Sequence, residues 1–380
     1  MSARLKLGMV GGGEGAFIGG VHRIAARIDG QWDLVAGALS SDPVRAHASA
    51  ATLGIAPDRS YDSFAQMAQA EAARDDGIDA VAIVTPNHMH VPVALAFLHA
   101  GIHVICDKPL ASQMHDALQL EQVLAASGKL FVLTHNYSGY PLIRQARDMV
   151  ARGDLGRLRL VHVEYVQDWL SEPASGKQAE WRTDPARSGA GGAIGDIGTH
   201  AWQLAEFVTG ETPEALAADL SSFVEGRAVD DNAHVMLRYA SGARGMLWAS
   251  QVAVGNENAL RLRIHGDKGG LDWAQENPNQ MRFTRFGAPS QTLTRGGAGA
   301  TDAGLATTRI PAGHPEGYLE GFATLYREAA DAIRQHDTVR SSAPDTLLPG
   351  LAAGLSGMRF IDACLKSSQA GGVWTATRAT

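Results

Sequence analysis

The sequence predicts an α/β domain followed by an α+β domain, and three observations lead to this fold class. First, a short apolar run at 5–10 leads into a glycine-rich turn. Second, short apolar runs alternate with helix-like segments as far as residue 133. Third, from residue 158 onward several runs alternate apolar and polar residues between tight turns. The alternation of apolar runs with helix-like segments is typical of βαβ units in a doubly wound parallel sheet. The alternation of apolar and polar residues is typical of a large, mainly antiparallel sheet.

Length and composition agree with two globular domains, which we place at 1–137 and 138–380. The chain has 380 residues, of which 45% are apolar and 19% charged. Its net charge of −7, without a block of Lys or Arg, is unlike a nucleic-acid-binding protein. Two cysteines favour a reducing compartment, and no apolar run reaches the ~18 residues of a membrane helix. We expect a cytoplasmic protein with no nucleic-acid or membrane partner.

The N-terminal half contains five strand patterns with helices between them. The strands are expected at 5–10, 33–39, 79–85, 103–106 and 130–133, and the helices beyond residue 20 and at 44–53, 63–72, 91–100 and 111–126. The run at 79–85 is continuously apolar, as in strands buried on both faces. Pro43 suits the first position of its helix, with Ser41 or Asp42 as the N-cap.

The C-terminal half begins with a helix at 141–152 and continues mainly as strands. These are expected at 158–166, 216–225, 233–239, 243–254, 261–265, 270–273, 280–286 and 373–377. Two further helices are expected at 316–335 and 347–368. Residues 289–308 are rich in Gly, Ala and Thr without a period, which predicts a long mobile loop.

The glycine-rich turn follows the first strand and precedes a helix, which is the context of a dinucleotide fingerprint. Gly11 and Gly13 fit the first two glycine positions, because only glycine turns tightly and lets the backbone approach a pyrophosphate. The third position is either Ala16 or, in a longer loop, Gly19. A glycine-rich turn without a ligand is the alternative.

Two polar stretches are candidates for chemistry. Asp107, Lys108 and Pro109 follow an apolar strand, at the sheet edge where ligands bind in open α/β sheets. The second stretch, 191–200, carries Asp196 and His200, which share one face if the segment is helical from Asp196. A lysine, a carboxylate and an imidazole acting together would make a proton-transfer site.

Taken in order, the glycine turn, Asp107-Lys108-Pro109 and Gly-Gly-x-x-x-Asp-x-x-x-His at 191–200 resemble the glucose–fructose oxidoreductase, inositol dehydrogenase and rhizopine-catabolism (Gfo/Idh/MocA) family. The resemblance spans the chain, including the segment 314–318, although the family usually has Glu where this chain has Asp107. Residues 167–169 and 181–185 look most like the levoglucosan dehydrogenase branch. Membership implies an NAD(P)-dependent oxidoreductase that acts on a secondary hydroxyl of a sugar, cyclitol or polyol.

The resemblance implies that Lys108, Asp196 and His200 are the catalytic residues, and that Pro109 follows a cis peptide bond. We expect His200 to act as the general base, Lys108 to stabilise the alkoxide and Asp196 to orient the hydroxyl or the lysine. The expected cofactor-binding residues are Gly11, Gly13, Ala16, Gly19, Ser40, Ser41, Arg45, Pro86, Asn87, His90, Asp107, Lys108, Pro109 and Asn136. The expected substrate-binding residues are Lys108, Tyr137, Asp168, Trp169, Trp181, Arg182, Asp196 and His200.

The end of the second strand bears on which dinucleotide is used. NAD-specific domains usually place Asp or Glu there, whereas this strand ends in Ser40 and Ser41. Asp42 suits an N-cap better, and Ser40 and Arg45 suit a 2′-phosphate. The pattern favours NADP, followed by use of both dinucleotides.

Alternatives follow from the same residues. His88 and His90 lie two apart on a loop without a third ligand, so we expect no metal site. Two other functions fit the fold, namely NAD-dependent glycoside cleavage and non-catalytic sensing of a dinucleotide or sugar. A broad sheet with one free face also predicts a homodimer or homotetramer.

Overall fold

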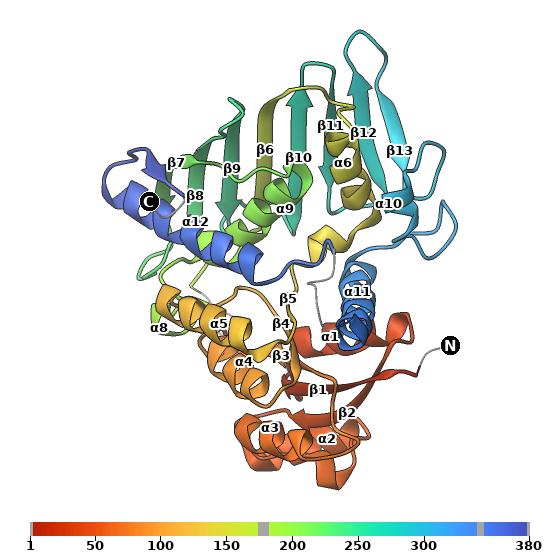
Figure 1. Cartoon of the computed structure of the whole chain (residues 1–380). Coiled ribbons are helices and arrows are strands. Elements are labelled where there is room, and N and C mark those ends of the chain that lie inside the picture. The colour runs from red at the N-terminus through yellow and green to blue at the C-terminus, as the bar shows by residue number, and fades with distance from the viewer. Residues whose placement is uncertain (1–2, 174–181, 340–345, 378–380) are drawn as a thin grey trace. The chain divides into compact units, whose positions relative to one another are not determined.

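The computed structural model describes residues 3–173, 182–339 and 346–377, and the chain divides into two compact units (Figure 1). The first unit contains residues up to Asn136 together with Tyr318–Leu355, and the second contains Tyr137–Gly317 and Ser356–Thr380. The sequence places 318–355 in the C-terminal domain. The structure groups this segment with the first unit because Phe322, Tyr326 and Ile333 share one hydrophobic core with the N-terminal strands.

The first unit is built on a five-stranded parallel sheet with the order β2-β1-β3-β4-β5, which confirms the predicted doubly wound domain. Its strands are β1 (Leu5–Gly11), β2 (Trp32–Ala38), β3 (Ala80–Val84), β4 (His103–Cys106) and β5 (Phe131–Leu133). The chain order reverses between β1 and β3. Ligands of open α/β sheets bind beyond the carboxyl ends of the strands at such a point.

The helices of the first unit are α1 (Phe17–Ile28), α2 (Pro43–Thr52), α3 (Phe64–Ala72), α4 (His90–His99), α5 (Met114–Ser127) and α11 (Tyr318–Val339). Short 3-10 turns precede α3 and α4, at Pro57–Arg59 and Asn87–Met89. Helix α11 packs along α1, and Trp32 Nε1 donates to the Tyr326 carbonyl over 2.8 Å. A helix from the far end of the sequence therefore closes this core.

The second unit is built on a nine-stranded sheet with the order β13-β12-β11-β10-β6-β9-β8-β7-β14. Its strands are β6 (Leu158–Val166), β7 (Ala215–Ser221), β8 (Asn232–Arg238), β9 (Arg244–Ser250), β10 (Ala259–Gly266), β11 (Gly269–Ala274), β12 (Gln280–Arg285), β13 (Gln291–Thr294) and β14 (Thr375–Ala376). Among the described strands of this sheet, β6 and β9 alone pair in parallel, and the other pairs are antiparallel. The sheet is mixed but mainly antiparallel, as predicted.

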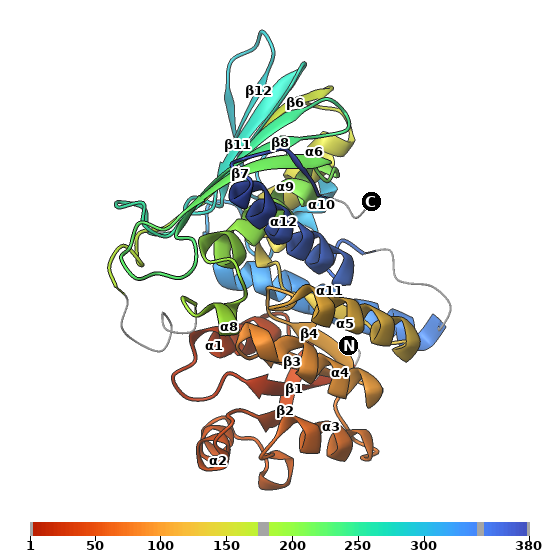
Figure 2. The ribbon, with the colours of Figure 1, turned by 90° about the vertical axis from the view of Figure 1, so that its left-hand side faces the viewer.

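Helices lie along one face of this sheet, as Figure 2 shows for α6, α9 and α12. The remaining helices are α6 (Pro141–Ala151), α8 (Pro185–Ser188), a π-helix (Ile194–Gly198), α9 (Thr199–Thr209), α10 (Asp302–Leu305) and α12 (Leu351–Gln369), of which α12 begins in the first unit and continues in the second. A 3-10 turn spans Asn136–Gly139. On the helix-covered face, Val161, Leu247 and Leu262 are fully buried, whereas their neighbours on the other face are partly exposed. Among the described residues no helix is long and apolar enough to cross a membrane.

The structure corrects the prediction of a long unstructured loop at 289–308. This segment contains β13, which pairs with β12, and the short helix α10. Thr301 caps α10 by accepting the N–H of Gly304 over 3.4 Å. Composition misled the prediction because turn glycines such as Gly296 and Gly299, both with positive φ, separate elements too short to show a period.

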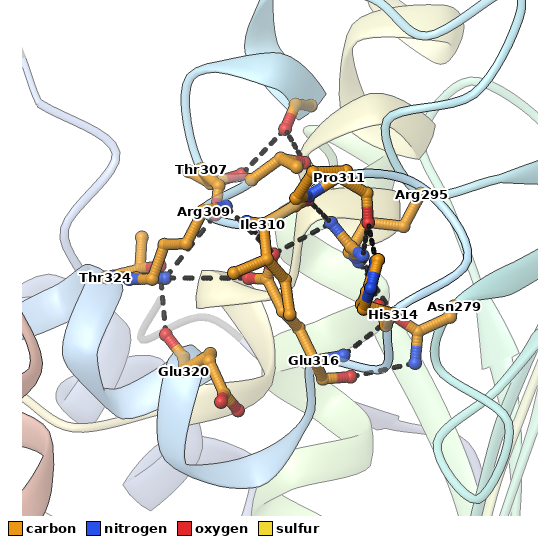
Figure 3. A network of polar contacts seen from close by, with 12 residues as sticks. Asn279, Arg295, Thr307, Arg309, Ile310, Pro311, His314, Glu316, Glu320 and Thr324 are labelled. Carbon is orange, nitrogen blue, oxygen red and sulfur yellow. Dashed lines mark hydrogen bonds and ion pairs between the residues drawn. The ribbon is translucent and has the colours of Figure 1, made fainter.

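A buried ion pair ties this segment to the residues that follow it (Figure 3). Arg295 Nη1 donates to Glu316 Oε1 over 2.7 Å and to the Ile310 carbonyl over 2.8 Å, and its Nη2 donates to the Pro311 and His314 carbonyls. Both side chains are about 1% exposed. The guanidinium therefore fixes the fold of residues 309–316 from inside.

Several strands are shorter in the structure than predicted, notably 216–225 and 243–254. The predicted strand 216–225 ends at Ser221, because the N–H groups of Phe223 and Val224 turn onto the carboxylate of Asp231. The predicted strand 243–254 ends at Ser250.

Candidate active site

The glycine-rich loop of the first unit is built for close approach of the backbone. Gly11, Gly12 and Gly15 have φ values of 79°, 71° and 75°. A Cβ on Gly19 would lie 2.4 Å from the Cα of Gly12, so the start of α1 packs directly on the turn. This is the packing role of the third fingerprint glycine. Gly19 occupies it, whereas Ala16 is the N-cap residue of α1.

The N-terminus of α1 is open to an anion. No side chain in the described part of the chain caps it, and its first turn carries no acidic residue. The first N–H groups of a helix lack partners within the helix and attract negative charge. Together with the Gly12–Gly19 contact, this cradle fits the pyrophosphate of a dinucleotide.

Beyond β2, Asp42 is the N-cap of α2, one of the two residues that the sequence offers for this position. Asp42 accepts the N–H groups of Val44 (2.9 Å) and Arg45 (3.2 Å), so its carboxylate caps α2. Ser40 Oγ accepts the N–H of Asp42 over 3.1 Å. Ser41 and Arg45 are exposed.

Beyond β3, Pro86 leads into the turn that carries Asn87, which is 6% exposed. His90 is buried at the start of α4, where its Nδ1 lies 2.7 Å from the Pro109 carbonyl and its Nε2 lies 2.9 Å from the Thr85 carbonyl. Both carbonyls only accept, so two complete bonds require a protonated ring, although burial lowers the pKa of His90. The distances show in either state that His90 ties the end of β3 to Pro109.

Beyond β4, the peptide bond between Lys108 and Pro109 is cis, as the resemblance implies. Thr134 Oγ1 donates to Asp107 Oδ1 over 3.0 Å. Burial, and next the positive charge of Lys108, lower the pKa of His135 to about 3. His135 is therefore neutral beside the lysine, and the neighbouring Asn136 is also buried.

In the second unit, Asp196 lies in the π-helix and His200 in the first turn of α9. The sequence predicts one α-helix from Asp196, whereas the structure has a π-helix that leads into α9. Single π-turns are rare and occur often at functional sites. The start of this segment is anchored by Asp230, whose carboxylate accepts the N–H groups of Gly192 (2.7 Å) and Ile194 (2.8 Å). A Cβ on Gly192 would lie 1.9 Å from the Asp230 carbonyl oxygen, so the close contact requires glycine.

Arg182 and Gln251 are among the partners of the Asp196 carboxylate. Arg182 Nε donates to its Oδ2 over 3.2 Å, and Gln251 Nε2 donates to the same oxygen over 2.9 Å. Both bonds restrict the orientation of the carboxylate.

His200 is 8% exposed and lies between two tyrosines. Its ring centroid is 5.0 Å from that of Tyr137 and 5.9 Å from that of Tyr165. The two tyrosine hydroxyls lie 2.7 Å apart, and Tyr165 Oη donates to Asn258 Oδ1 over 2.8 Å. Burial raises the pKa of Tyr137 to about 12, so this tyrosine stays protonated.

Trp169 is 44% exposed, and its Nε1 donates to Gln167 Oε1 over 2.9 Å. Gln167 in turn donates to Asn258 Oδ1 over 2.7 Å. Asp168 accepts the N–H of Gly255 through Oδ2. Arg182 stacks over the Trp169 ring at 5.8 Å, which joins Trp169 to Asp196 through one guanidinium. Trp181 lies outside the described residues.

Sequence reasoning missed Gln251, Tyr165, Asn258 and Asp230. Gln251 directly follows β9 and Asn258 directly precedes β10. Polar residues at strand ends are common in this sheet, so they gave no specific signal. Their role depends on which strands are neighbours, which the sequence pattern does not determine.

One group of side chains has metal-ligand character among the described residues, namely His103, His336 and Asp337. His103 Nδ1 accepts the N–H of Leu130 over 2.9 Å, so the proton of the neutral ring is on Nε2. That nitrogen faces Asp337 Oδ1 at 3.4 Å. In a metal-bound imidazole the nitrogen away from the metal normally donates a hydrogen bond. If Nε2 of His103 bound a metal, that nitrogen would be Nδ1, which accepts from Leu130 instead, so the Leu130 bond opposes metal binding.

Comparison with known proteins identifies the family. Residues 5–135 match the model described as "Oxidoreductase family, NAD-binding Rossmann fold", and residues 143–272 match the "GFO/IDH/MocA C-terminal domain". The chain belongs to the Gfo/Idh/MocA oxidoreductase family. An uncharacterized oxidoreductase of Bacillus subtilis, YfiI, is 35% identical across 98% of this chain and 97% of its own.

Other members of the family show its range. An inositol dehydrogenase homolog from Azotobacter vinelandii, solved with NAD+, is 36% identical over 99% of this chain and 98% of its own, with a TM-score of 0.94. The same protein was solved with NADH and myo-inositol, with a TM-score of 0.92. Levoglucosan dehydrogenase of Pseudarthrobacter phenanthrenivorans is 29% identical over 73% of this chain and 75% of its own.

Proposed function

We propose that this Gfo/Idh/MocA oxidoreductase transfers a hydride between NAD(P) and a secondary hydroxyl of a sugar, cyclitol or related polyol. The observation that carries the proposal is the Asp196–His200 segment, where a carboxylate held by Arg182 and Gln251 lies four residues before a buried imidazole. The A. vinelandii homolog solved with NADH and myo-inositol supports the substrate class.

The roles follow from chemistry. His200 accepts the hydroxyl proton, because the ordinary pKa of imidazole lies near neutral pH. Lys108 stabilises the developing alkoxide with its positive charge, and Asp196 orients the hydroxyl. The nicotinamide supplies the hydride chemistry when bound. Trp169 offers an exposed ring to a sugar face, while Tyr137, Asp168, Arg182 and Trp181 complete the proposed substrate contacts.

The glycine cradle of Gly11, Gly13 and Gly19 and the uncapped start of α1 fit the dinucleotide. We propose that Ala16, Pro86, Asn87, His90, Asp107, Pro109 and Asn136 surround it as well. We propose that the adenosine ribose binds to Ser40, Ser41 and Arg45. We propose a preference for NADP over NAD, supported by the capping role of Asp42, which leaves no acidic group committed to the ribose. The solved complexes of the A. vinelandii homolog, with NAD+ and with NADH, support NAD instead.

The decisive experiment is a panel of sugars and cyclitols assayed separately with NAD+ and NADP+. Net NAD(P)H formation from a free polyol supports the proposal. Release of a sugar from a glycoside without net change at 340 nm would instead indicate glycoside cleavage. Dinucleotide binding with neither reaction would indicate a sensor.

We also propose a homodimer or homotetramer formed through the open face of the nine-stranded sheet. Met236 and Met246 are opposite each other on β8 and β9 and are 52% and 55% exposed. The neighbouring ion pairs Arg261–Asp272 and Arg263–Glu164 give this face a polar side. The molar mass of Met236→Lys by light scattering, compared with that of wild type, tests whether this face forms the interface.

We also propose a cytoplasmic location, which the two buried free cysteines, Cys106 and Cys364, support.

A further inference from the structure

Behind the Asp107-Lys108-Pro109 turn lies a fully buried histidine that the proposed chemistry does not use. His22, on α1, is 0% exposed, and its ring packs on Phe322 at 5.0 Å between centroids. Its Nδ1 lies 2.8 Å from the Tyr326 hydroxyl of α11. Among the described residues its Nε2 has no hydrogen-bond partner; it lies 3.7 Å from Asp107 Oδ1, beyond hydrogen-bond distance.

The charges around Asp107 decide which nitrogen carries the proton. Burial tends to raise the pKa of Asp107, but His22 and then Lys108 outweigh it and hold this pKa well below its usual range. Asp107 is therefore a carboxylate. A lone pair on Nε2 would face that negative oxygen, whereas an N–H on Nε2 is attracted to it.

In the tautomer that carries its proton on Nε2, Nδ1 accepts, so Tyr326 donates to it. Burial, followed by the Asp107 charge, raises the pKa of Tyr326, which keeps its hydroxyl protonated as a donor. The result is a directed series in which Tyr326 donates to His22 and His22 points its N–H at Asp107. Thr134 donates to the same Asp107 oxygen over 3.0 Å.

We propose that His22 is a positioning residue for Lys108, acting through Asp107. The inference rests on the proposed function, in which Lys108 stabilises the alkoxide. Lys108 lies between Asp107 and Pro109. Pro109 is held by His90, whose Nδ1 lies 2.7 Å from its carbonyl. His22 and His90 therefore hold the two residues that flank the lysine, and a displacement of about 1 Å at a reacting group costs up to about 10²-fold in rate.

The test separates the two nitrogens of His22. In His22→Gln the amide nitrogen takes the place of Nε2, which keeps a donor toward Asp107 and loses the contact with Tyr326. In His22→Asn the side chain takes the place of Nδ1, which keeps the contact with Tyr326 and loses the donor. Tyr326→Phe removes the same contact between α1 and α11 as His22→Gln does, and Lys108→Met tests the proposed function itself.

We expect kcat with the polyol that the panel identifies to fall about tenfold or more in His22→Asn and to stay within about threefold in His22→Gln. Tyr326→Phe should lose less than His22→Asn. The Kd for dinucleotide and the midpoint of thermal unfolding should stay close to wild type in the asparagine variant. Equal losses in both His22 variants, or losses in neither, would overturn the role through Asp107.

Lys108→Met should lose most activity while it still binds dinucleotide. If that variant keeps the wild-type rate, the proposed role of the lysine fails independently of His22. A second measurement needs no substrate. The chain has six lysines, so ¹³C-dimethyl-lysine NMR resolves them, and Lys108→Met assigns the signal of Lys108. That signal should move in His22→Asn and stay in place in His22→Gln; an unmoved signal in both would contradict the proposal.

Discussion

Gln251 donates its side-chain N–H to Asp196 Oδ2 over 2.9 Å, from the turn beyond β9 to the π-helix before α9. The same oxygen accepts from Arg182 over 3.2 Å. The carboxylate thus accepts hydrogen bonds from segments that are about 70 residues apart in sequence. Because Asp196 is proposed to orient the reacting hydroxyl, its geometry should depend on both donors.

Removal of the Gln251 amide should weaken catalysis without unfolding the chain. A hydrogen bond to a charged group is worth about 1.5–3 kcal/mol, so Gln251→Leu should lower kcat/KM by about tenfold or more. Gln291→Leu, an exposed change on β13, is the matched control. A kcat/KM equal to wild type in Gln251→Leu would show that the orientation of Asp196 does not depend on Gln251.

His200→Ala should lower kcat by about 10²–10⁴-fold, the usual loss when a general base is removed. The Kd for dinucleotide, measured by fluorescence titration, should stay unchanged. His99→Ala removes an exposed imidazole at the end of α4 and should have no effect on rate. Turnover in His200→Ala at the wild-type rate would exclude His200 as the base.

Ser40→Asp should turn the cofactor preference toward NAD+, because a carboxylate there repels a 2′-phosphate and accepts from ribose hydroxyls. Arg45→Ala should weaken use of NADP+ without improving use of NAD+. The measurement is kcat/KM for each dinucleotide in the three proteins. If wild type already prefers NAD+ by a hundredfold, or about 2.7 kcal/mol, then the proposed preference is wrong.

Asp230 should make stability depend on pH. Burial raises its pKa from 3.8 to about 6 despite the N–H groups of Gly192 and Ile194. Since the folded-state pKa is the higher one, the folded chain binds this proton more tightly. The contribution to stability is present below the unfolded pKa, near 4, and is lost as the pH rises through about 6.

Asp230→Asn should remove that contribution, which is at most about 3 kcal/mol for a shift of this size. Urea unfolding at several pH values between 4 and 7 should give a flatter free-energy profile for the variant than for wild type. Asp219→Asn, an exposed change on β7, should leave the profile unchanged. Parallel profiles for wild type and Asp230→Asn would contradict the raised pKa.

The sequence by itself determined the fold class and most elements of both units, because local patterns carry them. Continuous apolar runs with glycine turns specify buried parallel strands, and Pro43 with Asp42 specifies the start of α2. The ordered motifs at Gly11, Lys108 and His200 also sufficed for the family. Each element or motif is a local signal, and the family follows from the order of these motifs along the chain.

Only the tertiary structure decided which distant residues support the candidate site. The pairing of β6 with β9, the return of α11 to the first unit, the π-turn at Asp196 and the burial of His22 all depend on contacts across the chain. A lone histidine in an amphipathic helix has the same local signal whether it faces leucine or a carboxylate. Its neighbours are decided by how helices pack, so its chemistry appears only in the folded chain.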